Sequence, residues 1–281
     1  MMQQIAYELH QHTHAFSIKT NQPAVLDFCM APGGFVSYIV KRYRKCSVDA
    51  FSLPPSQGGH DVLIKSGEDD PRVQIHFADI TMYAAQFGIE TIAQDHLEQQ
   101  TLLQPWPHEP KQYDLVLCDG QVLRTQIIPE YRKGCEASRL TNAQLFLGLE
   151  MIKEGGTMII LPHKAYISPC FKLICMFNSF SEVQLYKSSK FHKERSWFYL
   201  IAKNVRARSP EAITAMEKFK RLWEKNTFQP QDPFKNDSED PDTDDLRASV
   251  HEFGPRFIEL ARPIWQTQVT ALKMALWMQK P

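Results

Sequence analysis

The chain has 281 residues, 43% of them apolar, and its 32 acidic and 32 basic residues give a formal net charge of +0. This composition supports a sizeable buried core in one or two domains. The balanced charge excludes a protein that attracts nucleic acid through a strongly basic overall field, and no segment approaches the roughly 18 consecutive apolar residues of a membrane span. Because the N-terminus lacks a signal-peptide pattern, we expect an intracellular protein, cytoplasmic or nuclear, with no membrane contact.

Six cysteines are spread along the chain, and no two of them have Cys-x-x-Cys spacing. Several fall in or beside apolar segments, where cysteine usually packs as a small hydrophobic residue. The spacing therefore predicts neither a disulfide framework nor a bound metal.

Residues 25–35 read Val-Leu-Asp-Phe-Cys-Met-Ala-Pro-Gly-Gly-Phe, which predicts an apolar strand, a tight turn and the start of a helix. Turn glycines let a ligand approach the backbone, and the first turn of the helix offers unpaired N–H groups. The segment lacks both the Gly-x-Gly-x-x-Gly and the Gly-Lys-Ser/Thr patterns of phosphate-binding loops. It favours a nucleoside cofactor such as S-adenosylmethionine (SAM). The alternative is that four small residues merely close a strand-to-helix turn.

The rest of the first 205 residues alternates between strand and helix patterns. A short helix is predicted at 3–16, and no regular element is assigned between 82 and 110. Further strands are predicted at 46–51, 73–77, 113–118, 157–161, 183–187 and 197–202. A helix at 140–154 is predicted from the capping-box spacing of Thr141 and Gln144 and from Gly155-Gly156 at its end, and another helix at 168–179. This alternation indicates an α/β fold with a mostly parallel sheet and helices on both faces.

The composition changes after residue 205, so we divide the chain into a first domain, 1–205, and a helical C-terminal extension, 206–281. A charged amphipathic helix is predicted at 210–225. Residues 228–245 hold seven acidic residues against one basic residue, which is typical of a disordered linker.

Beyond the linker, apolar residues recur at helical spacing between 246 and 279, with predicted breaks at Gly254-Pro255 and at Pro263. Such helices either pack back on the first domain or bind a partner protein. We favour packing.

Polar side chains stand at the ends of five predicted strands, where ligands bind in open α/β sheets. They are Asp27, Ser52, Asp79, Asp119 and Lys164. Together they predict a cofactor site with an adjacent acceptor site. The alternatives are a helix N-cap for Asp79, an Asp-Gly turn for Asp119 and a solvated loop position for Lys164.

The pattern Asp-x-Cys-x-Ala-Pro-Gly-Gly-Phe at 27–35 resembles the first motif of the FtsJ/RrmJ-like methyltransferases of the ribose 2′-O type. The resemblance covers about residues 1–205 and implies a Rossmann-like SAM-dependent methyltransferase domain. Ser52 departs from the family, which commonly has an acidic residue there. The cofactor residues that the resemblance implies are Asp27, Met30, Ala31, Pro32, Gly33, Gly34, Phe35, Ser52, Leu53, Asp79, Ile80 and Asp119.

The ribose 2′-O-methyltransferases of this family use a Lys-Asp-Lys-Glu tetrad. Asp119 and Lys164 stand where the family pattern has its Asp and second Lys, and Lys19 is the one candidate for the first Lys. Trp197 occupies the position of the Glu, and Glu194 lies three residues earlier. The resemblance therefore implies a tetrad whose Glu is missing from its expected position.

We accordingly expect SAM-dependent methylation of an RNA ribose 2′-hydroxyl. Residues 187–195, here called the basic loop, would either contact phosphates or form a solvated charged loop. Trp197 would either stack on a base or pack in the core. Two alternatives remain open. One is a methyltransferase with a non-RNA acceptor, which the zero net charge and the missing Glu favour. The other is a catalytically inactive SAM- or RNA-binding scaffold that acts through its C-terminal helices.

Overall fold

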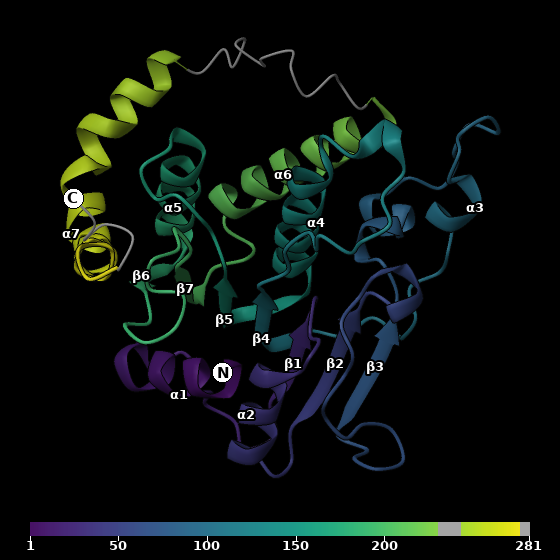
Figure 1. Cartoon of the computed structure of the whole chain (residues 1–281). Coiled ribbons are helices and arrows are strands. Elements are labelled where there is room, and N and C mark those ends of the chain that lie inside the picture. Colours follow the sequence, from purple (N-terminus) through teal and green to yellow (C-terminus); the bar gives the residue numbers. More distant parts are fainter. Residues whose placement is uncertain (230–242, 276–281) are drawn as a thin grey trace.

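A seven-stranded sheet runs through the protein, which we describe over residues 1–229 and 243–275 of a computed structural model (Figure 1). The strand order is β3-β2-β1-β4-β5-β7-β6, and β7 alone among these strands runs antiparallel to its neighbours. The strands are β1 (Ala24–Asp27), β2 (Ser47–Ser52), β3 (Val73–Phe77), β4 (Tyr113–Cys118), β5 (Ile152–Ile160), β6 (Glu182–Tyr186) and β7 (Tyr199–Val205). The predicted mostly parallel α/β sheet is thus confirmed.

Helices cover both faces of this sheet (Figure 1). One face carries α1 (Met2–Thr13) and α2 (Gly34–Arg42). The other carries α4 (Glu136–Met151), α5 (Ser168–Phe180) and α6 (Pro210–Phe228), and α7 (Thr243–Lys273) lies at the β6 edge beside α5. The connections hold the short helix α3 (Gln99–Leu102) and the 3₁₀ turns η1 (Pro55–Gln57), η2 (Ile80–Met82), η3 (Ala84–Phe87) and η4 (Glu130–Arg132). No described helix combines the length and the apolar character that a membrane span requires.

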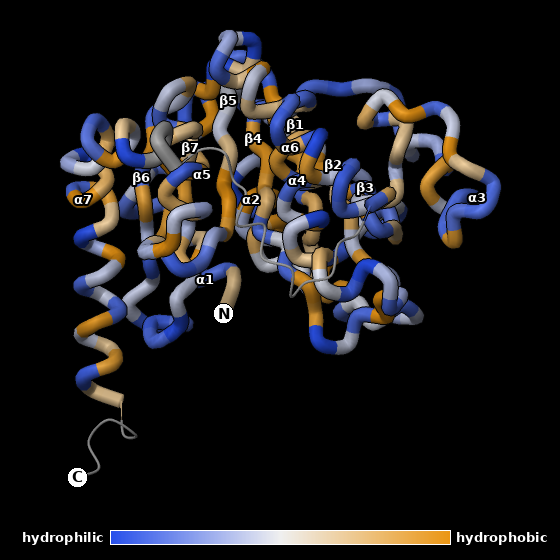
Figure 2. Tube along the Cα trace, turned by 90° about the horizontal axis from the view of Figure 1, so that it is seen from above, coloured by the Kyte–Doolittle hydropathy of each residue, from blue (hydrophilic) through white to orange (hydrophobic). Residues whose placement is uncertain are grey.

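The central strands are buried on both sides, because their side chains alternate between two apolar layers. Val25 and Leu115 pack in the layer of α1 and α2, whereas Leu26 and Val116 pack in the layer of α4. Figure 2 shows the apolar residues concentrated along these strands. Nearly continuous apolar runs such as Asp-Leu-Val-Leu-Cys in β4 follow from this double burial.

The predicted boundaries of the helix at 140–154 were wrong. α4 begins at Glu136, so Gln144 lies in mid-helix, where it is buried and binds the backbone of Gly120 instead of capping the helix. Gly155 and Gly156 lie inside β5, with a shift of register after Gly156. These glycines therefore accommodate an irregular strand and do not end a helix.

The predicted breaks in the C-terminal helices were also wrong, because Pro255 and Pro263 lie inside the continuous helix α7. Each proline removes one backbone hydrogen bond. Phe253, Phe257 and Ile264 are buried on the face of α7 that meets α5 and β6, and this burial offsets the loss. Of the predicted linker 228–245, the first residue belongs to α6 and the last three to α7, while residues 230–242 lie outside the described residues.

We expect that replacing Phe257 by alanine lowers the free energy of unfolding by about 3 kcal/mol. The Phe257 side chain is 8% exposed and its ring centroid lies 5.0 Å from that of Phe171 on α5. The matched control is Ile258→Ala on the outer face, where the side chain is 46% exposed and the expected change is within about 0.5 kcal/mol. Urea denaturation measures the free energy of unfolding of both variants. Equal losses in the two would contradict the packing of α7 on α5.

Candidate functional site

A cavity of about 640 Å³ opens at the carboxyl ends of the parallel strands. Its floor comes from the segments that directly follow β1 to β4, and its other walls come from the start of α1 and from residues 187–199. This is the edge of the sheet at which open α/β folds bind ligands.

Seven of the residues predicted for the cofactor line this cavity. They are Ala31, Pro32, Ser52, Leu53, Asp79, Ile80 and Asp119. The remaining five are not among the lining residues: Asp27, Met30, Gly33, Gly34 and Phe35.

Neighbouring segments of the chain take up the space beside the turn glycines. Gly33 has a φ of +102°, and a Cβ there would stand 2.6 Å from the side chain of Ile64. A Cβ on Gly34 would stand 2.2 Å from Cβ of Met2. The two glycines therefore let α1 and the segment around Ile64 pack against the turn.

Asp119 follows β4 at the cavity wall. Its Oδ1 is buried and has no hydrogen-bond partner among the described residues. The next residue is fixed, because Gln144 accepts from Gly120 N at 2.8 Å and donates to Gly120 O at 3.2 Å. A buried carboxylate oxygen without a partner is costly, so this site suits a ligand that brings a cation or a donor.

A second carboxyl group, that of Asp27, lies next to Asp119. Asp27 is 1% exposed and accepts a hydrogen bond from Cys29 N. Burial raises the pKa of Asp27 well above its usual range, and the neighbouring Asp119 charge raises it further. Burial also raises the pKa of Asp119, to about 7. The pair therefore retains a proton near neutral pH, and a bound cation would favour its release.

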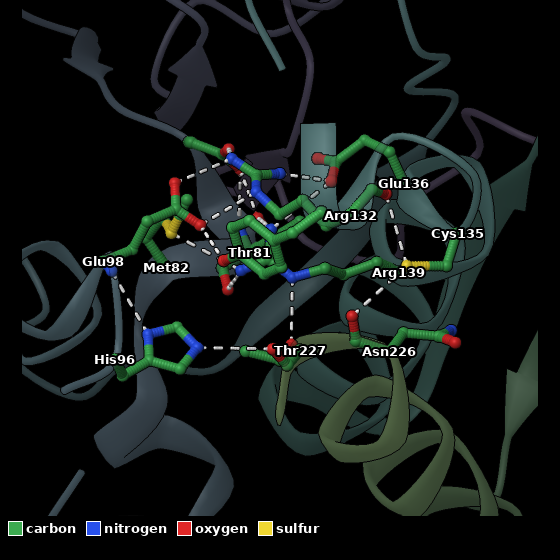
Figure 3. Close-up of polar contacts among 12 residues, drawn as sticks. Thr81, Met82, His96, Glu98, Arg132, Cys135, Glu136, Arg139, Asn226 and Thr227 are labelled. Atoms are coloured by element: carbon green, nitrogen blue, oxygen red, sulfur yellow. Dashed lines mark hydrogen bonds and ion pairs between the residues drawn. The ribbon is translucent and has the colours of Figure 1, made fainter. Parts of the chain in front are cut away.

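Asp79 is held in place by a buried polar network, of which Figure 3 shows the part around Thr81, Arg132 and Arg139. Its Oδ1 accepts from the hydroxyl and the amide of Thr81, at 2.6 and 3.0 Å. Arg139 is fully buried and donates to Thr81 Oγ1 and O, while Arg132 lies 3.9 Å from the Asp79 carboxylate. Asp79 thus caps η2 and also lines the cavity. Its position is compatible with both interpretations made from the sequence, an N-cap and a residue of the cofactor site.

The structure does not bring the predicted catalytic residues together. Lys164 is exposed, with a φ of +54°, and the residue on the cavity wall after β5 is Leu161. Lys19 is exposed between α1 and β1, and Glu194 is exposed and accepts from Gln268 of α7 through its carbonyl. Of the four predicted catalytic residues, Asp119 alone lines the cavity.

The lysine that does line the cavity is Lys187, the first residue of the basic loop. It is 8% exposed, and its ammonium donates to the carbonyls of Arg195 and Trp197 at 2.6 Å each and of His192 at 3.3 Å. Burial lowers its pKa to about 8. From the sequence, Lys187 was expected to contact phosphates with the rest of the basic loop, because only the fold shows that its ammonium binds carbonyls of the loop itself.

The basic loop is also tied to α1. Ser188 donates to the buried carboxylate of Glu8 at 2.8 Å, and Lys190 lies 3.4 Å from the same group. Trp197, just beyond the loop, is 39% exposed and lines the cavity, with its ring centroid 5.9 Å from that of His192. Trp197 is therefore a wall residue and not a core residue.

The cavity fits the expected cofactor. Its volume lies within the range of about 300–1,000 Å³ typical of small-molecule sites. Leu53 and Ile80 offer apolar surface for a base. The carboxyl groups of Asp79 and Asp119 offer acceptors for the hydroxyl and amino groups of SAM and, when ionised, a negative charge for its sulfonium.

One family model and several solved structures resemble this chain. A family model described as FtsJ-like methyltransferase matches residues 2–205. Similar solved structures include a Plasmodium falciparum protein described as a ribosomal RNA methyltransferase, with 19% identity over 72% of this chain and 97% of that chain and a TM-score of 0.45. Human methyltransferase-like protein 13 in complex with S-adenosylhomocysteine (SAH) has 13% identity over 84% and 98% of the two chains and a TM-score of 0.41. No curated protein sequence matches the chain.

The family model begins at the first residue of α1 and ends at the last residue of β7, so it takes in the whole sheet and every wall of the cavity. The chain therefore belongs to the FtsJ-like methyltransferase family, whose members use S-adenosylmethionine.

Proposed function

We propose that this methyltransferase acts on a ribose 2′-hydroxyl of RNA. The observation that supports an RNA acceptor is the cavity wall formed by residues 187–199, where the exposed side chain of Trp197 stands beside the basic loop. An aromatic face next to cationic side chains is the combination that binds single-stranded nucleic acid, through stacking and phosphate contacts. Lys193 and Arg195 supply such cations in the loop.

The chain's own residues have separate tasks in this proposal. Leu53, Asp79 and Ile80 hold the nucleoside part of the cofactor, and Asp119 faces its charged centre. When bound, SAM supplies a methyl group carried on a sulfonium. Positioning accounts for much of the acceleration in such a transfer.

Asp119 is the residue that we assign to proton transfer. Burial raises the pKa of its carboxyl group, and the ionised form can accept a proton from the acceptor hydroxyl, as a general base does. Lys187 is unsuited to this task, because three backbone carbonyls already accept from its ammonium. Lys164 and Lys19 lie away from the cavity lining.

We expect the affinity for SAM to rise by up to about tenfold between pH 6 and pH 8. Asp119 is largely protonated below its pKa of about 7 and carries its charge above it, and a sulfonium favours the charged form. Asp27 and Tyr199 also face this carboxyl, and burial raises the pKa of both. SAH has no sulfonium, so its affinity should change less. Calorimetric titrations at several pH values measure the affinities for SAM and SAH. If the two affinities changed with pH in parallel, the role of Asp119 would be contradicted.

The proposed acceptor is tested by incubating the protein with methyl-labelled SAM and pools of capped, structured and single-stranded RNA. Because a 2′-O-methyl group blocks alkaline cleavage of the next phosphodiester, label should appear in alkali-resistant dinucleotides. DNA of the same sequence should remain unlabelled. Trp197→Ala should weaken RNA binding by roughly 5-fold to 150-fold, the value of one stacked base. Label on a base, or on a small molecule, would overturn the ribose proposal.

A second candidate is a scaffold that binds SAM or RNA without catalysis. The observation that favours it is the placement of Lys19, Lys164 and Glu194 outside the cavity lining. Firm binding of SAM with no transfer to any RNA pool or small acceptor would support this second candidate over the first.

A further inference from the structure

A second group of polar side chains lies on the face of the sheet beneath the segment that leads into β4. Asp49 of β2, His76 of β3 and His108 of this segment each offer one ligand atom, and these atoms all lie within 4.8 Å of one another. Asp49 and His76 share a face, because Phe51 stands two residues after Asp49 and pairs with His76. None of the three lines the cavity described above.

We propose that Asp49, His76 and His108 form a binding site for a divalent transition-metal ion of the zinc type. Two imidazoles and one carboxylate are a ligand set that zinc accepts. The segment that carries His108 has little regular structure, so an ion here would tie it to β2 and β3. The spacing of the sequence could not reveal the site, because its ligands come from three separate segments.

His108 is oriented as a metal ligand usually is. Its Nδ1 lies 2.9 Å from the carbonyl of Glu109, which places the proton on Nδ1 and leaves the lone pair on Nε2. That lone pair now accepts from Trp106 Nε1 at 3.0 Å. The indole N–H of Trp106 would have to give up this hydrogen bond when an ion binds to His108 Nε2.

His76 lacks the partner that a buried nitrogen normally has. Its Nε2 is buried and makes no hydrogen bond among the described residues. An ion would satisfy this nitrogen.

Asp49 is 8% exposed and carries the negative charge of the cluster. Lys111 Nζ and Tyr113 OH donate to its Oδ2, at 2.8 and 3.0 Å. The ammonium of Lys111 competes with an ion for this carboxylate, but its side chain is 36% exposed and can turn into solvent. Ligand atoms around tetrahedral zinc stand about 3.3 Å apart, so the three groups would move closer together on binding.

The competition by Lys111 provides a sharp test. Chelator-treated full-length protein is titrated with Co²⁺, whose visible absorption reports on its ligands, and then with Zn²⁺. We expect one equivalent of Co²⁺ to bind, Zn²⁺ to displace it, and Zn²⁺ to raise the Tm. Lys111→Met should tighten binding by about tenfold, or about 1.4 kcal/mol, because it removes the competing charge.

Two further variants complete the experiment. His76→Ala should weaken binding by at least about a hundredfold. His251→Ala, which removes an exposed histidine on α7, should bind like the unchanged protein. Circular dichroism checks the folding of each variant. The proposal is overturned by uptake well below one equivalent, by unchanged affinity in His76→Ala, or by weaker binding in Lys111→Met. Since the readouts are absorption, stoichiometry and Tm, the result is independent of any methyl transfer.

Discussion

Replacing Asp119 by asparagine should lower the rate of methyl transfer by about 10² to 10⁴, the usual contribution of a general base. Asparagine keeps the shape of the side chain but cannot take up a proton. The affinity for SAM should change by less than about tenfold, because the nucleoside part of the cofactor is held by Leu53, Asp79 and Ile80. Single-turnover rates and calorimetric titrations separate the two effects.

The matched control for Asp119→Asn is Lys164→Ala. Lys164 is exposed and outside the cavity lining, so its removal should leave the rate within about threefold of the unchanged protein. If Lys164→Ala lost as much activity as Asp119→Asn, the assignment of proton transfer to Asp119 alone would be wrong.

Replacing Arg139 by alanine should lower the free energy of unfolding by about 3–5 kcal/mol. Arg139 is 0% exposed and donates to Thr81 and to Thr227, and it lies 3.6 Å from the buried carboxylate of Glu136 (Figure 3). Its removal takes a buried donor from the hydroxyls of Thr81 and Thr227, while Arg132 remains as the partner of Glu136. Since Thr81 orients Asp79, the folded fraction of the variant should also bind SAM more weakly.

The comparison for Arg139→Ala is Arg221→Ala, an exposed arginine on α6. It should change the unfolding free energy by no more than about 0.5 kcal/mol. Urea denaturation measures both variants. A loss below about 1 kcal/mol for Arg139→Ala would show that the network contributes little to stability.

Much of the fold could be predicted, because a strand that is buried on both faces is a nearly continuous run of apolar residues. The predicted ranges of β3 and β4 coincide with the structure. The helix ends were harder to predict, because they depend on contacts between residues that are distant in the sequence. Gln144 looked like a capping residue but binds Gly120, and Pro255 looked like a break but lies in a helix held by packing.

The candidate site could be predicted only in part. Strand ends marked Asp79 and Asp119, which do line the cavity. The same reasoning also marked Lys164, which lies beside Ser196 next to the wall residue Trp197 but is not itself a lining residue, so its role stays a prediction. Lys187 and Glu8 could not be identified, since their partners are set by the docking of α1 and the basic loop.

The central claim is that SAM binds in the cavity at the carboxyl ends of β1 to β4, and calorimetric titration of a cavity-blocking variant tests it most directly. Leu53→Trp places a large ring on the cavity wall, and Leu97→Trp places the same ring at a position that is 80% exposed and outside the lining. We expect the unchanged protein and Leu97→Trp to bind SAM and SAH at one site per chain, and Leu53→Trp to bind at least about tenfold more weakly while remaining folded. Absence of SAM binding by the unchanged protein, or equal binding by a folded Leu53→Trp variant, would contradict the account.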